Sequence, residues 1–359
     1  MKLLMVARRF PPDVRSGTET VFENLWQHAR RRHEVRLVVG FQQRRDLVPP
    51  DAVAVDLRGA RRPQAWKRLW VTAFRELRRF RPDAVLANSI ETPTLGAPTA
   101  CIVHDLNFGL AQRGAGTLAR EWFYRAKCGW LDAVVAVSQA TADRLVELGV
   151  DPERIHVIHN GVDLDVFRPV PRAHSPDEPA DFVRFACPGR ILPGKGQHLA
   201  LDALARLPRR YKERAHLVIA GAAADPIFVD QLRIQAYNQP VEILTNVPRI
   251  APIHQGADVI LFPTLMEEGF GFTAIDGMAC GKPVIWSDQP AVREATGGVG
   301  FPVPQGDVEA MRDAMRQLMD DPDLRAKVGA EGRAFVEQRY AWDRTWARYE
   351  AVLQGIMGT

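Results

Sequence analysis

The feature that most constrains the fold is a regular alternation of short apolar, β-branched runs with longer amphipathic segments along almost the whole chain. Strands that alternate with helices in this way form parallel sheets covered by helices on both faces. The alternation therefore predicts an α/β protein. The predicted strands are 2–8, 34–40, 52–57, 83–89, 99–105, 133–138 and 155–161 in a first series, and 183–188, 216–221, 242–245, 258–263 and 283–287 in a second.

A proline-rich stretch, residues 168–181, separates the two series and has the composition of a linker. A chain of 359 residues is long enough for two domains. We therefore expect two Rossmann-like domains that face each other across a cleft, with ligands at the carboxyl ends of the strands. The expected boundaries are 1–168 for the first domain, 169–181 for the linker, 182–339 for the second domain and 340–359 for a C-terminal helix that could return to the first domain.

Charge is distributed unevenly between the two predicted domains. Lys and Arg outnumber Asp and Glu by 47 to 43, but residues 1–168 contain 26 and 19, a balance of +7, which leaves −3 for the remainder. A basic first half favours an anionic partner, whether nucleic acid, a membrane surface or a phosphorylated substrate. The chain contains no nucleic-acid recognition motif, so we expect no nucleic-acid partner.

The compartment is predicted from the cysteines and from the apolar runs. The four cysteines lie far apart without a C-x-x-C pair, which predicts small buried side chains in a reducing cytosol. The first apolar run ends at Arg8 and Arg9 and is too short for a signal peptide. No stretch approaches the ~18 apolar residues that a membrane span needs. We expect a cytoplasmic protein that could still touch the inner face of the membrane.

Two glycine-containing loops after predicted strands are suited to bind an anion. Residues 10–19 lead into an amphipathic helix, and a glycine at such a helix start lets backbone amides approach an anion. The segment 189–196 holds three glycines together with Arg190 and Lys195, which can neutralise phosphate oxygens. It is not a Walker A loop, because Gly196 rather than Ser or Thr follows the lysine.

The strongest signal lies in residues 263–283, where a strand leads through Glu268 into a glycine-rich helix start and on to Asp276. Eight helical residues turn through about 800°, so these two acids project within about 80° of each other. One acid can therefore meet a ligand at the helix mouth while the other contacts hydroxyl groups deeper in the site. The amides of 269–271 would face a diphosphate.

Together these motifs resemble those of the retaining glycosyltransferases of family four, essentially from end to end. The resemblance implies the GT-B fold and a nucleoside-diphosphate sugar donor, UDP- or GDP-linked, with no further cofactor. The matching residues are Glu268 and Asp276 (acid-x7-acid), Gly189, Arg190, Lys195 and Gly196 (phosphate loop), Ser16, Gly17, Thr18 and Glu19 (Gly-Gly-x-Glu loop), His104 and Asp105 (His-Asp), and 160–163 (Asn-Gly-Val-Asp hinge).

The resemblance also implies roles for single residues. Arg190 and Lys195 would hold the donor diphosphate and neutralise the leaving group, and cationic stabilisation of this kind needs no metal. Glu268 would bond sugar hydroxyls, Asp276 would hold the ribose, and His104 would lie near the transferred sugar. The remaining donor-side candidates are Gly17, Gly189, Gly269, Phe270 and Gly271, and the acceptor-side candidates are Ser16, Gly17, Thr18, Glu19 and Asp105.

The sequence departs from the family pattern at two positions. Aspartate stands at 276 where the family usually has glutamate, which shortens the reach toward the ribose by one methylene. Ser16 replaces the first glycine of the N-terminal loop. Two D-x-D matches, 163–165 and 321–323, are typical of metal-dependent glycosyltransferases of another fold, but we interpret both as turn and helix-cap residues and expect no metal site.

Two predicted helices have apolar stripes. Between Arg58 and Arg81 nine basic residues and one acid surround a stripe from Trp66 to Phe80, and we expect that stripe to pack on the sheet. The basic face could meet an anionic acceptor or anionic lipid. In the final helix Trp342, Trp346 and Tyr349 fall near helical spacing and predict a packing stripe.

The sequence thus predicts a retaining, metal-independent glycosyltransferase that acts on a glycan, a lipid-linked saccharide or a cell-envelope saccharide. Two alternatives stay open. A nucleotide-sugar 2-epimerase of the same fold would convert the donor without an acceptor. A non-catalytic nucleotide-sugar-binding subunit would bind the donor and release no nucleoside diphosphate.

Overall fold

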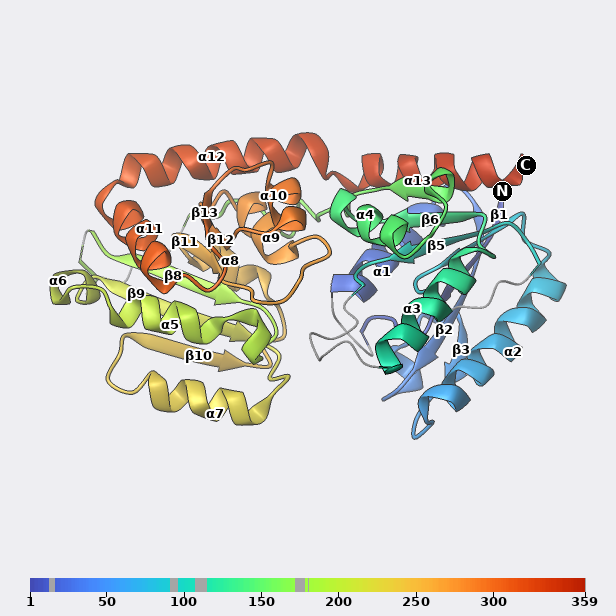
Figure 1. Cartoon of the computed structure of the whole chain (residues 1–359), viewed down its shortest axis with the longest axis horizontal. Helices are drawn as coiled ribbons and strands as arrows, with labels where there is room; N and C mark the ends of the chain where they lie inside the picture. The colour runs from blue at the N-terminus through green and yellow to red at the C-terminus, as the bar shows by residue number, and fades with distance from the viewer. Residues whose placement is uncertain (13–16, 91–95, 107–114, 172–177, 180, 359) are drawn as a thin grey trace. The chain divides into compact units, whose positions relative to one another are not determined.

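The computed structural model describes residues 1–12, 17–90, 96–106, 115–171, 178–179 and 181–358, which form two compact units (Figure 1). The first unit comprises Met1–Gly161 and Trp342–Thr359, and the second comprises Val162–Ala341. The chain therefore enters the second unit at Val162, before the expected boundary at residue 168. The amide of Val162 donates to the carbonyl of Tyr340 at 2.8 Å, which ties this entry point to the segment where the chain leaves the unit. In the stretch expected to be the linker, the described residues 169–171, 178–179 and 181 belong to the second unit.

The first unit contains a parallel sheet with the strand order β3-β2-β1-β4-β5-β6-β7. Every strand predicted for this half is present, although most end one to several residues earlier than expected. Alternation locates a strand but does not fix its last residue, because pairing with the neighbouring strand decides where the strand ends. The bounds are β1 Lys2–Ala7, β2 Glu34–Phe41, β3 Val53–Asp56, β4 Ala84–Ala87, β5 Thr99–Val103, β6 Ala133–Ala136 and β7 Ile155–Val157.

Helices join these strands and cover the sheet. One buried cluster lies between α2 and strands β1–β4, and another lies around β5, β6 and α4. The bounds are α1 Gly17–Ala29, α2 Arg62–Phe80, α3 Ala115–Cys128, α4 Gln139–Glu147 and α13 Trp342–Met357, with short 3-10 turns at Arg45–Leu47 and Pro152–Arg154.

The last helix, α13, belongs to the first unit, as the sequence analysis allowed. It contacts α1, β4 and β5. Trp346 and Tyr349 are almost fully buried and Trp342 is nearly so, which confirms the predicted packing stripe. A Cβ on Gly161 would lie 2.5 Å from the Trp342 indole, so the glycine of the hinge motif lets α13 approach the end of the first segment.

The second unit contains a parallel sheet with the order β10-β9-β8-β11-β12-β13. The five predicted strands are present, and β13 was not predicted, because it has only three residues with a proline at its centre. The bounds are β8 Val183–Pro188, β9 Ala215–Gly221, β10 Val241–Thr245, β11 Val259–Phe262, β12 Val284–Ser287 and β13 Phe301–Val303.

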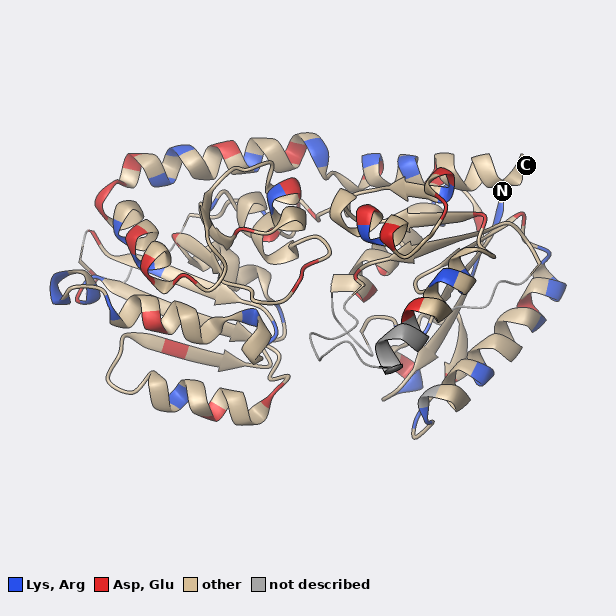
Figure 2. Ribbon diagram, in the orientation of Figure 1, with Lys and Arg blue, Asp and Glu red and all other residues tan. Residues whose placement is uncertain are grey.

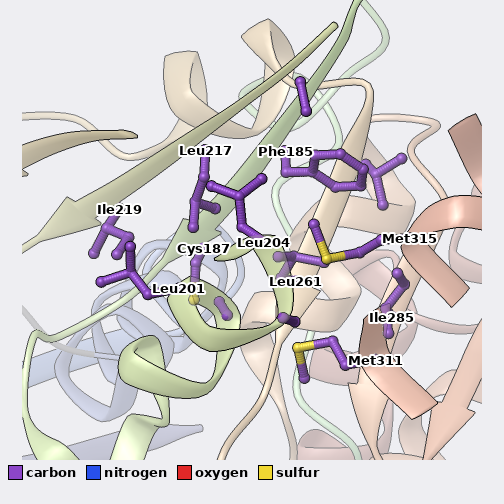
Figure 3. Packing of buried hydrophobic residues seen from close by; sticks show 14 of the residues in the cluster. Phe185, Cys187, Leu201, Leu204, Leu217, Ile219, Leu261, Ile285, Met311 and Met315 are labelled. Carbon is purple, nitrogen blue, oxygen red and sulfur yellow. The ribbon is translucent and has the colours of Figure 1, made fainter. Parts of the chain in front are cut away.

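One large apolar cluster fills the second unit between its sheet and the helices α5, α7 and α11. Figure 3 shows Phe185 and Cys187 of β8 with Leu201 and Leu204 of α5 and Met315 of α11 in this cluster. The helices are α5 Gln197–Ala205, α6 Arg209–Lys212, α7 Pro226–Gln235, α8 Ala251–Gly256, α9 Phe272–Ala279, α10 Pro290–Thr296, α11 Val308–Asp320 and α12 Pro322–Arg339, with a 3-10 turn at Pro193–Lys195.

The basic helix α2 differs from its prediction in one respect. Leu69, Ala73 and Phe80 are buried against the sheet as expected, but Trp70 is 40% exposed and Phe74 is 46% exposed. The apolar stripe is therefore wider than the face that the sheet covers. Lys and Arg residues recur along the same helix (Figure 2). No helix in the described part of the chain combines the length and the apolar character needed to span a membrane.

Candidate active site

The turn after β8 presents an unpaired guanidinium. Gly189 has φ 142°, and only the Thr273 hydroxyl, at 3.8 Å, would contact a Cβ there, so a ligand can approach this backbone closely. Arg190 follows and is exposed, and its guanidinium has no hydrogen bond or ion pair within the described residues. The Gln197 side chain donates to the Arg190 carbonyl at 2.9 Å and fixes the loop. Arg190 is thus free to bind an anion at the carboxyl edge of the sheet.

Lys195 and Glu268, predicted from separate motifs, form an ion pair. The distance from Lys195 Nζ to Glu268 Oε1 is 2.5 Å, and the two side chains are only 17% and 14% exposed. Thr264 donates its hydroxyl to the same oxygen at 2.7 Å. Oε2 of Glu268 accepts no hydrogen bond from any residue in the described ranges, so it can accept one from a ligand hydroxyl.

Close backbone packing joins two loops, the phosphate loop of residues 189–196 and the glutamate loop of residues 263–271. Gly196 has φ 72°, and a Cβ on it would lie 1.9 Å from the carbonyl oxygen of Pro263 at the end of β11. The carbonyl of Gly194 accepts the amides of Leu265 at 2.8 Å and Met266 at 3.0 Å. Only glycine fits at 196, so the phosphate loop and the glutamate loop behave as one structure.

The sequence analysis did not identify Gln289, whose side chain holds the glutamate loop by hydrogen bonds. Its amide group donates to the carbonyls of Thr264 at 3.1 Å and Met266 at 2.9 Å, and its Oε1 accepts the amide of Glu268 at 3.2 Å. The side chain is 8% exposed. A polar residue two positions after a buried strand was the only sequence signal, and it does not reveal a partner more than twenty residues away.

Helix α9 begins at Phe272 with Gly271 as its N-cap, in the left-handed conformation at φ 99°. Asp276 lies on this helix, mostly buried, and its carboxylate has no partner within the described part of the chain. Burial raises the pKa of Asp276 well above its ordinary value. The Phe270 side chain is buried with its ring centroid 5.3 Å from that of Phe272, so Phe270 can offer a ligand only its backbone.

The first unit carries a second set of predicted residues around a cavity of about 270 Å³ at the carboxyl edge of its sheet. His104 and Asp105 follow β5, and Thr18 and Glu19 lie in the first turn of α1; all four line the cavity. Gly17 is exposed at the start of α1. Ser16 lies outside the described residues.

His104 is held as a neutral imidazole. Its Nε2 lies 2.8 Å from Asn88 Oδ1, while Asn88 Nδ2 donates to the Thr18 carbonyl at 3.5 Å. Because an amide oxygen only accepts, this arrangement assigns the proton to Nε2 and leaves Nδ1 as an acceptor. Nδ1 is buried and has no hydrogen-bond partner in the described ranges. Burial lowers the pKa of His104 to about 4.

The two D-x-D matches have structural roles, as predicted. Oδ1 of Asp163 accepts the amides of Asp165 at 3.1 Å and Val166 at 3.0 Å in a turn. Asp321 is the N-cap of α12, and its carboxylate accepts the amide of Leu324 at 2.8 Å.

Two family models match the chain. Residues 15–166 match the model described as Glycosyltransferase Family 4, and residues 174–335 match the model described as Glycosyl transferases group 1. The chain belongs to glycosyltransferase family 4. The matched ranges cover the strands and loops that carry both sets of site residues described above, apart from β1.

Curated relatives in this family match part of the chain. D-inositol 3-phosphate glycosyltransferase of Xylanimonas cellulosilytica is 32% identical over 241 residues, which cover 60% of this chain and 55% of that protein. Alpha-maltose-1-phosphate synthase of Mycolicibacterium smegmatis is 28% identical over 289 residues, which cover 72% of this chain and 73% of that protein. The chain spans a little over half the length of the inositol-phosphate relatives.

Solved structures match the chain over its whole length. HepE of Anabaena, crystallised with UDP-glucose, has a TM-score of 0.78 at 19% identity and covers 99% of this chain and 100% of its own. Sucrose-phosphate synthase of Thermosynechococcus elongatus has a TM-score of 0.82 at 18% identity and covers 99% of both chains. These likenesses show that the fold is GT-B.

Proposed function

We propose that the protein transfers a sugar from a UDP- or GDP-linked donor to an acceptor, with retention of the anomeric configuration and without a metal ion. The observation that carries the proposal is the Lys195–Glu268 ion pair, together with Arg190 of the same loop as Lys195, which has no ion-pair partner among the residues that the structure describes. Two cations suit a diphosphate, and the open oxygen of Glu268 suits a sugar hydroxyl. Asp276, on the adjoining helix, would hold the ribose.

In the proposed transfer, one bond to the anomeric carbon breaks and one forms. The bond from the anomeric carbon to the diphosphate oxygen breaks, and the acceptor oxygen bonds to that carbon on the same face. The acceptor proton passes to the departing phosphate oxygen, while Arg190 and Lys195 stabilise the remaining negative charge. His104, whose Nδ1 is an acceptor, would orient a hydroxyl of the transferred sugar.

The relatives support the substrate classes. HepE was solved with UDP-glucose, and a starch synthase catalytic domain from Arabidopsis thaliana was solved with ADP and acarbose. The D-inositol 3-phosphate glycosyltransferases are named for a phosphorylated polyol. The basic first half of this chain fits an anionic acceptor of the same general kind.

A thermal-shift panel of UDP, GDP, ADP and their glucose conjugates tests the donor site, because a ligand of the folded state raises the unfolding temperature. We expect one nucleoside diphosphate and its sugar conjugate to raise it, and the Arg190→Ala variant to lose most of that effect. The absence of any shift across the panel would refute the donor assignment. Transfer in the presence of a chelator, followed by NMR of the product's anomeric centre, tests metal independence and retention.

The two alternatives give different outcomes with the same ligands. A 2-epimerase converts a sugar nucleotide into its epimer with no acceptor present. A binding subunit shows the thermal shift and releases no nucleoside diphosphate with any acceptor. Transfer requires release that depends on an acceptor.

We also propose that the protein works in the cytoplasm and that its first unit touches the inner face of the membrane through Arg58–Arg81. Trp70, Val71 and Phe74 are exposed on α2 among its basic residues, and Trp122 on α3 is 73% exposed. Exposed aromatic side chains with neighbouring cations suit the interface of an anionic bilayer.

Sedimentation with vesicles tests this contact. We expect binding to vesicles that contain phosphatidylserine, weakened by salt and by the Trp70→Ser/Phe74→Ser double variant, and no binding to neutral vesicles. Ile234→Ser is a matched control, because Ile234 is an exposed apolar residue of the second unit. Equal sedimentation of the double variant and the parent protein would remove α2 from the interface.

A further inference from the structure

Arg9 has an unsatisfied donor at the wall of the first unit's cavity. It follows β1 directly and lines the cavity together with Asn88, His104 and Tyr124. Its Nε is buried and has no hydrogen-bond partner, and its guanidinium forms no ion pair with any residue that the structure describes. A buried N–H without an acceptor costs free energy, and a charged group costs more. An anion in the cavity would give the Arg9 guanidinium an acceptor that the described residues do not supply.

The neighbouring arginine is engaged elsewhere. The guanidinium of Arg8 lies 5.6 Å from the ring centroid of Trp66 on α2, in a cation–π contact. Trp66 thus engages the Arg8 guanidinium, whereas Arg9 is a cation of this wall with a donor that no described residue satisfies.

The other polar groups of the wall favour hydroxyls rather than a second anion. The carboxylates of Glu19 and Asp105 lie along the same wall, and a carboxylate that already has a partner can still accept a hydrogen bond from a ligand hydroxyl. A small molecule that contacts this acidic wall and Arg9 together has hydroxyl groups on one side and one anionic group on the other. A polyol or sugar that carries a phosphate or a carboxylate has this arrangement.

We propose that Arg9 binds the anionic group of the acceptor, a hydroxylated molecule with one phosphate or carboxylate, and so determines acceptor specificity. This assignment rests on the proposed function, since it takes the cavity as the acceptor site. The basic first unit would then bind the anionic group of the acceptor, whereas the cations of the second unit would bind the donor diphosphate.

Calorimetric titration of matched pairs tests the subsite. The probes are inositol 3-phosphate with inositol, glucose 6-phosphate with glucose, glycerol 3-phosphate with glycerol, and glucuronate with glucose, each in the presence of the preferred nucleoside diphosphate. We expect the charged member of at least one pair to bind roughly tenfold more tightly or better, the size of one charge-assisted hydrogen bond. The phosphate pairs and the glucuronate pair show which anion Arg9 prefers.

Variants separate Arg9 from general charge. Arg9→Ala, and Arg9→Gln as a less disruptive change, should bring the members of each pair to within about twofold, as expected when a charge-assisted contact is lost. Arg31→Ala is the control, because Arg31 is an exposed arginine of the same unit without an ion pair in the described ranges. Equal or undetectable binding of both members of every pair by the parent protein, or a preference that survives in both Arg9 variants, would overturn the subsite.

The nucleotide thermal shift keeps the two proposals apart. It depends on the second unit and should be unchanged in the Arg9 variants. Its absence from the parent protein would count against the proposed function, whatever the polyol titrations show.

Discussion

At the scale of single residues, the candidate donor site depends on charges that compensate one another. The Glu268 carboxylate is mostly buried, and Lys195 and the Thr264 hydroxyl both contact its Oε1. Removing either partner of such a pair leaves a poorly solvated charge, so the effect on function exceeds the loss of one contact.

Lys195→Ala should therefore lower turnover by roughly 10²–10³-fold, the scale of removing one preorganised stabiliser of developing charge. Glu268→Ala should have a similar effect, and circular dichroism should show an intact fold in both variants. Lys327→Ala is the matched control, since Lys327 is an exposed lysine of the same unit. Near-normal turnover in both site variants would refute the assignment of the donor site.

The buried carboxyl of Asp276 leads to a prediction about how the free energy of unfolding depends on pH. Burial raises the pKa of this carboxyl in the folded state, whereas the unfolded carboxyl titrates near the ordinary aspartate pKa of 3.8. The folded state therefore holds the proton more tightly, and the free energy of unfolding falls as pH rises above about 4. Asp276→Asn should raise the unfolding temperature of the ligand-free protein at pH 8 and leave it unchanged near pH 3.

The comparison with Asp165→Asn, an exposed aspartate of the same unit, separates this effect from a general change of charge. Thermal unfolding across the pH range gives the answer. A stabilisation by Asp276→Asn that does not vary with pH would show that burial of its charge is not the cause.

At the scale of elements, the candidate donor site consists of two loops and the start of α9. Residues outside the ligand-contacting set hold the loops in position. Gln289 holds the glutamate loop by three hydrogen bonds, and Gly196 lets the phosphate loop lie against the end of β11. Neither residue needs to touch a ligand. Both residues determine the positions of Lys195 and Glu268 by holding the loops that carry them.

Gln289→Ala should free the glutamate loop and lower kcat about tenfold or more, because small displacements of positioned groups cost rate. KM for the donor should change less, since Arg190 and Asp276 stay in place. Gln289→Glu should not rescue the rate, because a carboxylate cannot donate to the carbonyls of Thr264 and Met266. Initial-rate kinetics measure the split, and an unchanged kcat in Gln289→Ala would show that the loop holds itself.

The elements also show what a sequence can reveal about this protein. Alternation predicted every strand except β13, and the family resemblance implied that Lys195 and Glu268 would serve one donor site. Arg9 and Gln289 could not be found in that way, because their roles depend on contacts made only after folding. The exposed Trp70 and Phe74 illustrate the same limit, since periodicity gives the width of an apolar stripe but not how much of it the sheet covers.

At the scale of the whole molecule, the chain crosses between its two units twice, at Gly161–Val162 and at Ala341–Trp342. The first unit is therefore built from both ends of the described chain, while the second is one continuous segment. Packing of α13 against α1, β4 and β5 completes the first unit, with Trp346 and Tyr349 in the contact.

Trp346→Ala should consequently destabilise the first unit by about 3–5 kcal/mol, the range for truncating a fully buried aromatic side chain. We expect two thermal unfolding transitions, one for each unit, and a nucleoside diphosphate should shift only that of the second unit. The unfolding temperature of this ligand-sensitive transition should be the same in Trp346→Ala as in the parent protein. Gln354→Ala, an exposed position on the same helix, should leave both transitions unchanged. A loss confined to the ligand-sensitive transition would contradict the assignment of α13 to the first unit.

The return of α13 also sets an order of events during synthesis on the ribosome. All seven strands of the first sheet have been made by Val157, but the helix that contacts β4 and β5 begins only at Trp342. The second unit, which is continuous, can finish folding in the interval. The part of the protein that is translated first is thus the last to be completed, and until then the nascent chain carries an apolar surface that other proteins in the cell can reach.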